Sequence, residues 1–129
     1  MKTLKLRTES RVEMVNVTDQ VRKVVRDSGV MSGLCFVFCP HTTAGVTLNE
    51  NTDADVRKDF DLALARAVPR EGFTHSEGNS DAHVKASLVG SSVHVLVQNG
   101  KLVLGQWQAV YFCEFDGPRD RTLIVSVRT

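Results

Sequence analysis

Hydrophobic residues recur along the chain with two periods, the alternation typical of strands and the three-to-four spacing typical of helices. Residues 4–17 read as two short strands with a bend near residues 9–11. Thr18 is then placed to cap a helix that Gly29 ends. The apolar stripe of this helix consists of Val21, Val24 and Val25. The first quarter of the chain therefore predicts strand, strand and helix.

The segment from Gly33 to Cys39 is hydrophobic at odd and even positions alike, which is typical of a strand buried on both faces. A short strand is expected over residues 46–48, followed by a helix that Thr52 caps and Pro69 stops. The residues expected to form the buried stripe of this helix are Val56, Phe60, Ala63, Leu64 and Ala67.

The second half of the chain begins with a polar loop over residues 70–80 and a short helix over residues 81–89. Strands and turns follow, and Asn99-Gly100 is a strong hairpin signal because both central residues of a type I′ turn need positive φ. Strands thus lie toward both ends with helices between them. The pattern predicts an α+β fold with a largely antiparallel sheet, in a single domain over residues 1–129.

Net charge, the lengths of the apolar runs and the cysteine content indicate which partners and which compartment to expect. The net charge of +1 gives no electrostatic reason to expect binding to nucleic acid or to an anionic membrane surface. We expect no signal peptide and no membrane span, because the chain has no long apolar run. Three cysteines in apolar, strand-like segments suit a reducing compartment. We therefore expect a cytoplasmic protein.

Three of the four histidines lie in polar, loop-like surroundings. His41 follows the hydrophobic strand, His75 lies in the polar loop and His83 begins the short helix. Neutral imidazole is a common metal ligand, and three of them with an open position would suit a catalytic zinc ion. Their spacing is not a known metal signature, so hydrogen-bonded surface histidines are the alternative. His94 alternates with valines and is interpreted as structural.

Two further clusters could carry chemistry. Thr42 and Thr43 can offer hydroxyl groups beside Gly45, and Glu50 could serve as a general base or metal ligand. The alternative is that residues 49–52 are turn and cap residues. In the Gly-Pro turn near the C-terminus, Arg119 is well placed to bind a phosphate or carboxylate, unless neighbouring aspartates are its partners.

These motifs, taken together and in order, resemble the YjbQ-like family, also called the secondary thiamine-phosphate synthase family. The similarity covers nearly the whole chain. The segments that carry it are residues 40–46 (PHTTAGV), 49–51 (NEN), His75 with Asn79 and His83, residues 100–102 (GKL), 104–105 (LG), 107–108 (WQ) and 114–119 (EFDGPR).

The resemblance implies a trimer-forming α+β fold, largely an antiparallel β-sandwich with two to three inserted helices. It implies metal ligands at His41, His75 and His83, and catalytic roles for Glu50, Thr42, Thr43 and Arg119. By the same resemblance, Asn49 and Asn79 would help to bind the cofactor. This is expected to be a divalent metal, most simply zinc, with magnesium or manganese as alternatives.

The resemblance further implies a reaction in which a pyrimidine diphosphate joins a thiazole phosphate and pyrophosphate is released. Histidine ligands favour zinc or another transition metal, whereas diphosphates usually pair with magnesium, which prefers oxygen ligands. Metal-assisted hydrolysis of a phosphate ester is therefore an alternative function, and a non-catalytic metal- or ligand-binding module is a third. In each case we expect a small phosphorylated metabolite as partner, no nucleic acid, no membrane and a homotrimer.

Overall fold

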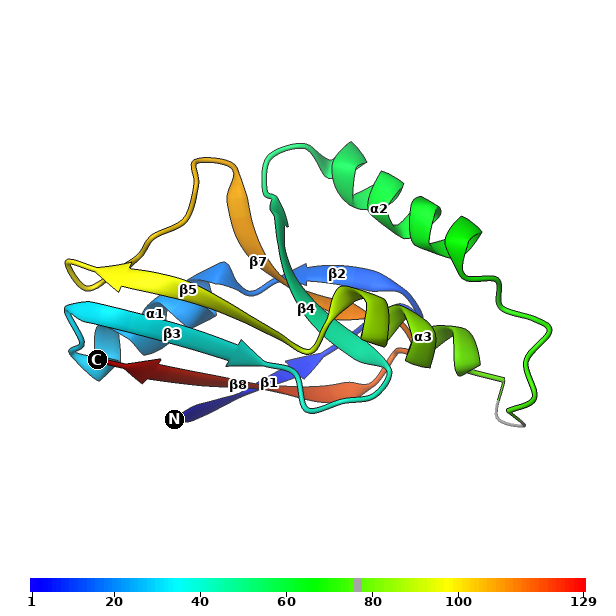
Figure 1. The fold of residues 1–129 in the computed structure, drawn as a ribbon, viewed down its shortest axis with the longest axis horizontal. Helices are drawn as coiled ribbons and strands as arrows, with labels where there is room; N and C mark the ends of the chain where they lie inside the picture. The colour runs from blue at the N-terminus through cyan, green and yellow to red at the C-terminus, as the bar shows by residue number, and fades with distance from the viewer. Residues whose placement is uncertain (76–77) are drawn as a thin grey trace.

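A computed structural model describes residues 1–75 and 78–129. Within these residues, eight strands form two sheets, and three helices connect strands along the chain (Figure 1). The elements in chain order are β1 (Lys2–Arg7), β2 (Glu13–Asn16), α1 (Thr18–Ser28), β3 (Ser32–Phe38), β4 (Ala44–Glu50), α2 (Ala54–Ala67), α3 (Ser80–Val89), β5 (Ser92–Gln98), β6 (Lys101–Leu102), β7 (Gln108–Glu114) and β8 (Asp120–Arg128). The prediction of a mixed, largely antiparallel α+β fold is confirmed.

The two sheets are antiparallel throughout their paired strands. One has the order β1-β8-β3-β5-β6 and the other the order β2-β7-β4. The predicted hairpin lies between β5 and β6, where Asn99 and Gly100 both adopt positive φ, 54° and 73°. Because pairings such as β1 with β8 join the two ends of the chain, the sheets are set by contacts far apart in sequence.

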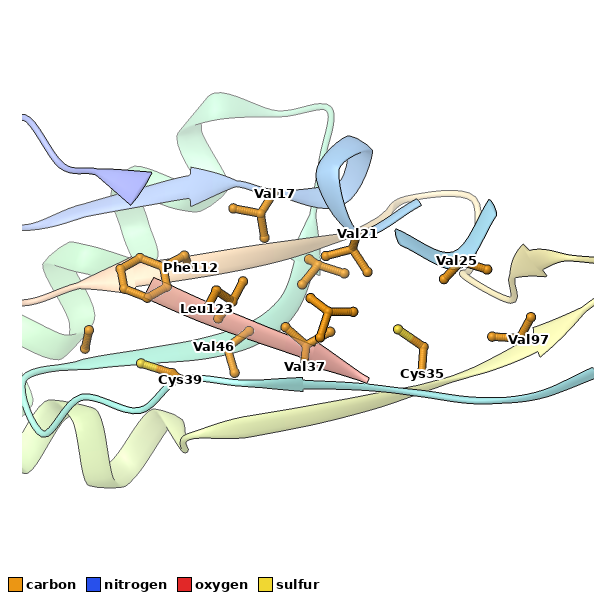
Figure 2. Packing of buried hydrophobic residues seen from close by; sticks show 13 residues of the cluster. Val17, Val21, Val25, Cys35, Val37, Cys39, Val46, Val97, Phe112 and Leu123 are labelled. Carbon is orange, nitrogen blue, oxygen red and sulfur yellow. The ribbon is translucent and has the colours of Figure 1, made fainter. Parts of the chain in front are cut away.

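The main core lies between the two sheets and is closed along one side by α1 (Figure 2). Its centre contains fully buried side chains from both sheets, including Val37, Val46, Phe112 and Leu123. A second apolar cluster covers the opposite face of β7, where Tyr111 and neighbouring residues pack against α2 and α3. The molecule therefore has three layers: the five-stranded sheet, the three-stranded sheet, and the pair α2 and α3.

The prediction that the strand over residues 33–39 is buried on both faces is wrong for a single chain. Cys35 and Val37 of β3 are buried in the core, but Phe36 and Phe38 point the other way and are 42% and 43% exposed. Leu96 on the neighbouring strand β5 is 60% exposed on the same face. The strand is thus buried on one face only within a single chain, because α2 and α3 cover the other sheet.

The helices also differ in detail from the sequence-based expectation. Neither predicted threonine cap forms: α1 begins after Val17, and the cap of α2 is Asp53, whose carboxylate accepts from the N–H of Asp55 at 2.9 Å. Thr18 instead accepts from the N–H of Val110 and ties α1 to β7. No residue of α2, all of which is described, is fully buried, since only one side of the helix meets the body of the protein.

Gly45 shows how closely the layers approach. A Cβ at this position would lie 2.7 Å from the carbonyl oxygen of Gly90, where α3 turns into β5. The N–H of Val46 donates to that same carbonyl at 3.1 Å. Only glycine leaves room for this contact, which fixes α3 against the start of β4. Across the described ranges, none of the helices has the length and apolar character needed to cross a lipid bilayer.

Candidate functional site

Several sequence-predicted site residues gather at one end of the molecule. The end of β3, the start of β4, the end of β7, the start of β8 and the start of α3 meet there, at the right of Figure 1. His41, Thr42 and Thr43 lie on the β3–β4 connection, and Arg119 lies on the β7–β8 turn. His75 and Asn79 precede α3, and His83 lies within it.

His41 occupies the place that β3 leaves open on β8. Pro40 has no N–H to donate, so the strand ends at Phe38, and the imidazole takes over the next backbone position. Its Nε2 lies 3.0 Å from the N–H nitrogen and 3.1 Å from the carbonyl oxygen of Thr122. The ring also meets Phe112 edge-on, with centroids 6.4 Å apart. The imidazole therefore has a fixed orientation.

The chemistry that His41 can offer depends on its tautomer. If Nε2 is bare, it accepts from the Thr122 N–H, and Nδ1 carries the proton and can donate to a ligand. If Nε2 is protonated, it donates to the Thr122 carbonyl, and Nδ1 is free to bind a metal. Partial burial, with the nearby Arg121 charge, lowers the pKa of His41 and keeps the ring neutral at pH 7.

His75 and His83 form the closest pair of imidazoles at this end. Their ring centroids are 5.7 Å apart and the planes are nearly perpendicular, at 87°. His83 is half-buried on α3, and its N–H donates to the carbonyl of Asn79, whereas His75 is exposed. A hollow of about 220 Å³ lies beside His75, lined by residues of the loop before α3, among them Arg70 and Phe73, and by Ser80 at the start of the helix. His75 thus stands at the rim of this hollow, and His83 lies next to His75.

The separation of these two rings fits a shared metal ion. Zinc–nitrogen bonds of about 2.1 Å put each ring centre about 3.2 Å from the ion, so two tetrahedral ligands have centres roughly 5.2 Å apart. The observed 5.7 Å is close to that value. Within residues 1–75 and 78–129, however, no three His, Cys, Asp or Glu side chains come together as a metal-binding group. Among the described residues of one chain, His41 therefore does not form a three-ligand group with His75 and His83.

Arg119 is held by the turn from which it projects. Its Nε donates to the carbonyl of Asp116 at 2.7 Å, and its Nη2 donates to the Asp116 carboxylate at 2.9 Å. The same carboxylate oxygen accepts from Nδ2 of Asn79 at 2.9 Å, which ties the turn to the start of α3. Burial alone would raise the pKa of Asp116, but hydrogen bonds from Asn79 and Arg119 lower it below its ordinary value. The guanidinium remains half exposed and available to an anion.

The two threonines after His41 have different surroundings. Thr42 is exposed, so its hydroxyl is accessible to a ligand. Thr43 is buried, and its hydroxyl accepts from Nη2 of Arg121 at 2.8 Å. Of the predicted hydroxyl pair, only Thr42 is presented to solvent, while Thr43 belongs to the internal framework.

Glu50 and Asn49 lie at the opposite end of β4 from the histidines. Six residue steps of about 3.3 Å separate Ala44 from Glu50, roughly 20 Å. Asn49 Oδ1 accepts from the N–H of Glu50, and Glu50 Oε1 accepts from the N–H of Thr52 at 3.3 Å. Both residues thus serve the turn that leads into α2. Within one chain, the fold does not bring Glu50 into the same pocket as the three histidines.

Two groups with important positions were not among the sequence-predicted residues. Glu114 and Arg121 form an ion pair and are 0% and 6% exposed. Asp81 is 1% exposed and binds Arg11 through both carboxylate oxygens, at 3.0 and 3.3 Å. The residue pattern signalled Glu114 as a charged residue inside an apolar strand, and such a residue is costly to bury unless it is paired.

The chain was compared with known proteins and solved structures. It is 48% identical to the UPF0047 protein YugU of Bacillus subtilis over 129 residues, or 98% of each chain. It is 44% identical to the UPF0047 protein MJ1081 of Methanocaldococcus jannaschii, over 95% of this chain and 89% of the other.

The same relationship appears in three dimensions. A YjbQ/UPF0047 family protein from Clostridium acetobutylicum superposes with a TM-score of 0.98 at 49% identity, covering 99% of this chain and 100% of the other. A YbjQ-like protein from Sulfolobus solfataricus gives a TM-score of 0.94 at 31% identity, covering 98% and 94%. The family described as "UPF0047 protein YjbQ-like" matches residues 2–129. This chain therefore belongs to the YjbQ-like UPF0047 family.

Proposed function

We propose that the chain is an enzyme for a small phosphorylated metabolite, with a divalent metal bound by His75 and His83. The observation that carries this proposal is the pair of imidazoles with centroids 5.7 Å apart, beside a hollow of about 220 Å³. Zinc suits imidazole ligands better than magnesium does, so we propose zinc. When bound, such an ion would act as a Lewis acid toward a phosphoryl oxygen.

The other residues at this end supply groups suited to phosphate. Arg119 offers a half-exposed guanidinium held by Asp116, and the Thr42 hydroxyl is exposed. Guanidinium and hydroxyl donors both bind phosphate oxygens, and the guanidinium offsets the negative charge. His41, in the tautomer with a bare Nε2, would add a donor at Nδ1. The chain would thus bind and orient the phosphate while the imidazole pair holds the ion.

Two reactions fit this arrangement. The family resemblance favours the thiamine-phosphate synthase reaction, in which a pyrimidine diphosphate joins a thiazole phosphate and releases pyrophosphate. The imidazole pair favours metal-assisted hydrolysis of a phosphate ester, because histidine-bound zinc commonly activates water. Incubating the protein with each substrate set separates them: coupled product only when both synthase substrates are present favours the first, and phosphate release from a single ester favours the second.

We further propose that the metal site is completed by a second copy of the chain in a homotrimer. One chain supplies two ligands, and Glu50 lies about 20 Å from the histidine end along β4. The outer face of the five-stranded sheet is apolar, with Phe36, Phe38 and Leu96 each more than 40% exposed. Burial of that face between copies would remove apolar surface from water and could bring donors from two chains together.

The metal is tested by elemental analysis of the purified protein and two variants. His83→Ala removes one proposed ligand, whereas Val84→Ala shortens an exposed side chain on the same helix and serves as the control. We expect a stoichiometric ion in the wild type and in Val84→Ala, and its loss from His83→Ala. A wild-type protein that binds no ion after incubation with zinc, or a His83→Ala variant with full occupancy, would refute the metal site.

A further inference from the structure

The carboxylate of Glu114 is the most heavily bonded side chain near the site. Its Oε1 accepts from the Thr8 hydroxyl at 2.7 Å and from Nε of Arg121 at 2.8 Å. Its Oε2 accepts from the N–H groups of Phe115 and Asp116, each at 3.1 Å, and also from Nη2 of Arg121. These donors connect Glu114 to the β3–β4 connection and to the β7–β8 turn, the two segments that carry His41 and Arg119.

One arm of this network leads to the connection between β3 and β4. Nη2 of Arg121 donates to the hydroxyl of Thr43 at 2.8 Å, and the N–H of Phe115 donates to the Thr43 carbonyl at 3.2 Å. Thr43 follows His41 by two residues. The position of the His41 backbone is therefore tied to Glu114 through Arg121.

The second arm leads to the turn between β7 and β8. The Asp116 N–H is bonded directly to Glu114, and the Thr8 hydroxyl that donates to Glu114 also accepts from the N–H of Arg119 at 2.9 Å. Gly117 makes this packing feasible, since a Cβ there would lie 2.3 Å from the carbonyl oxygen of Ser10 and 2.8 Å from Cγ of Glu114. Asp116 and Arg119 are thus fixed relative to the same carboxylate.

Stability alone does not explain the buried ion pair of Glu114 and Arg121. Two charges removed from water lose much of their hydration, and apolar residues of similar volume often stabilise a core as well or better. A fully bonded buried network does define one geometry, because each displaced member leaves an unsatisfied group in a low-dielectric interior. Burial pushes the pKa of Glu114 upward, but hydrogen bonds from Arg121 and Thr8 outweigh it, so the carboxylate is ionised at neutral pH.

We infer that Glu114 is a positioning residue that sets the placement of His41 relative to Arg119. It acts at one remove from any ligand, through Arg121 and Thr43 on one side and through Thr8 and the Asp116 N–H on the other. The inference rests on the proposed function, in which His41 and Arg119 face the same phosphorylated ligand. Glu114, and not Glu50, is then the acidic residue that organises this end of the fold, because Glu50 lies at the far end of β4.

Nuclear magnetic resonance of single variants tests the two arms separately. Thr43→Val removes the hydroxyl bond of the first arm and Thr8→Val the hydroxyl bonds of the second, while Glu114→Gln weakens both arms, since the amide has one acceptor oxygen instead of two. Thr18→Val is the matched control, because it removes another buried threonine hydroxyl, the one that accepts from Val110. The reporters are the His41 ring nitrogens, whose shifts give the tautomer, and the Arg119 Nε–H, whose exchange rate reports its hydrogen bond.

We expect Thr43→Val to change the His41 signals only and Thr8→Val to accelerate exchange of the Arg119 Nε–H only. Glu114→Gln is expected to change both and Thr18→Val neither. Unchanged His41 signals in Thr43→Val, or identical effects of all four substitutions, would overturn the inference. If Glu114→Gln does not fold, the two threonine variants and the control decide the matter by the same criteria.

A titration with inorganic pyrophosphate separates this inference from the proposed function. We expect Glu114→Gln to weaken pyrophosphate binding about 10- to 100-fold, the range typical of residues that orient metal ligands, and Thr18→Val to leave binding unchanged. Binding by Glu114→Gln equal to that of the wild type would overturn the positioning role. A wild-type protein that binds no pyrophosphate would refute the proposed function, and the resonance measurements would still decide the role of Glu114.

Discussion

Asp81 offers a quantitative test of how α3, which carries His83, is attached to the rest of the fold. Its carboxylate is 1% exposed and binds the Arg11 guanidinium through both oxygens, at 3.0 and 3.3 Å. The Lys85 ammonium lies 3.6 Å away and its side chain is 6% exposed. Asp81→Ala would leave two cations facing each other in a largely buried space.

The expected magnitude follows from this geometry. Removing one partner of a buried ion pair costs about 3–5 kcal/mol, and the lower end applies here because the Arg11 side chain is 26% exposed and can reach water. A domain of this size unfolds with roughly 5–15 kcal/mol, so the variant should still fold. At about 3–4 °C per kcal/mol, the midpoint of thermal unfolding should fall by roughly 10 °C.

The assay is urea denaturation of the wild type, Asp81→Ala and the control Lys85→Met. Lys85→Met removes the more distant cation and keeps the Arg11 pair, so its loss of unfolding free energy should be at most about 1 kcal/mol. Although burial alone would raise the pKa of Asp81, hydrogen bonding and charge from Arg11 lower it below the ordinary value of 3.8. The stabilisation is thus present above that value and is lost as pH falls through the lower folded-state pKa.

The difference between the wild type and Asp81→Ala should therefore be constant near neutral pH and shrink as the pH falls below 3.8. Two results would refute this reasoning. One is a loss for Asp81→Ala no larger than that for Lys85→Met. The other is a difference that does not depend on pH, which would indicate that lost packing, not lost charge, destabilises the variant.

Three further predictions concern other parts of the molecule. Gly117→Ala should lower the unfolding free energy by about 2 kcal/mol or more, because its Cβ would lie 2.3 Å from the Ser10 carbonyl oxygen; equal urea midpoints would contradict this. Phe36→Lys should convert the proposed trimer into single chains in sedimentation velocity without lowering their helix and strand content by circular dichroism, and an intact trimer would show that this face is not the interface. The lowered pKa of His41 means that the unfolded chain takes up a proton first as pH falls through 6.5, so the stability advantage of wild type over His41→Gln should shrink between about pH 7.5 and pH 5.5 in urea denaturation; an advantage that grows would contradict the assigned direction.

Local signals in the sequence determined most of the elements. The alternation of apolar residues predicted the strands, and Asn99-Gly100 predicted the hairpin because few residues other than asparagine and glycine adopt positive φ at low cost. Gly29 ended the first helix in the left-handed conformation, as expected for a C-terminal glycine. These features depend on neighbours in the chain, so the chain alone is enough to identify them.

Which faces are covered was decided by the tertiary structure. Phe36 and Phe38 have the same hydrophobic character as the buried Val37, and only the arrangement of the two sheets leaves them on the uncovered side. The stripe of α2 likewise looked like a core face, yet the helix touches the body along one edge only. Periodicity indicates which residues share a face, but it does not say what packs against that face.

For the candidate site, too, the sequence identified the residue types and the tertiary structure decided which of them come together. The sequence identified histidines, threonines and an arginine by their chemistry, and the fold then brought His75 to His83 and separated both from Glu50, because β4 is an extended strand with its two ends far apart. Glu114 and Arg121 are seven residues apart along the chain, on two strands of different sheets. Their pairing with Thr8 and Thr43 depends on how those sheets meet, which no local pattern encodes.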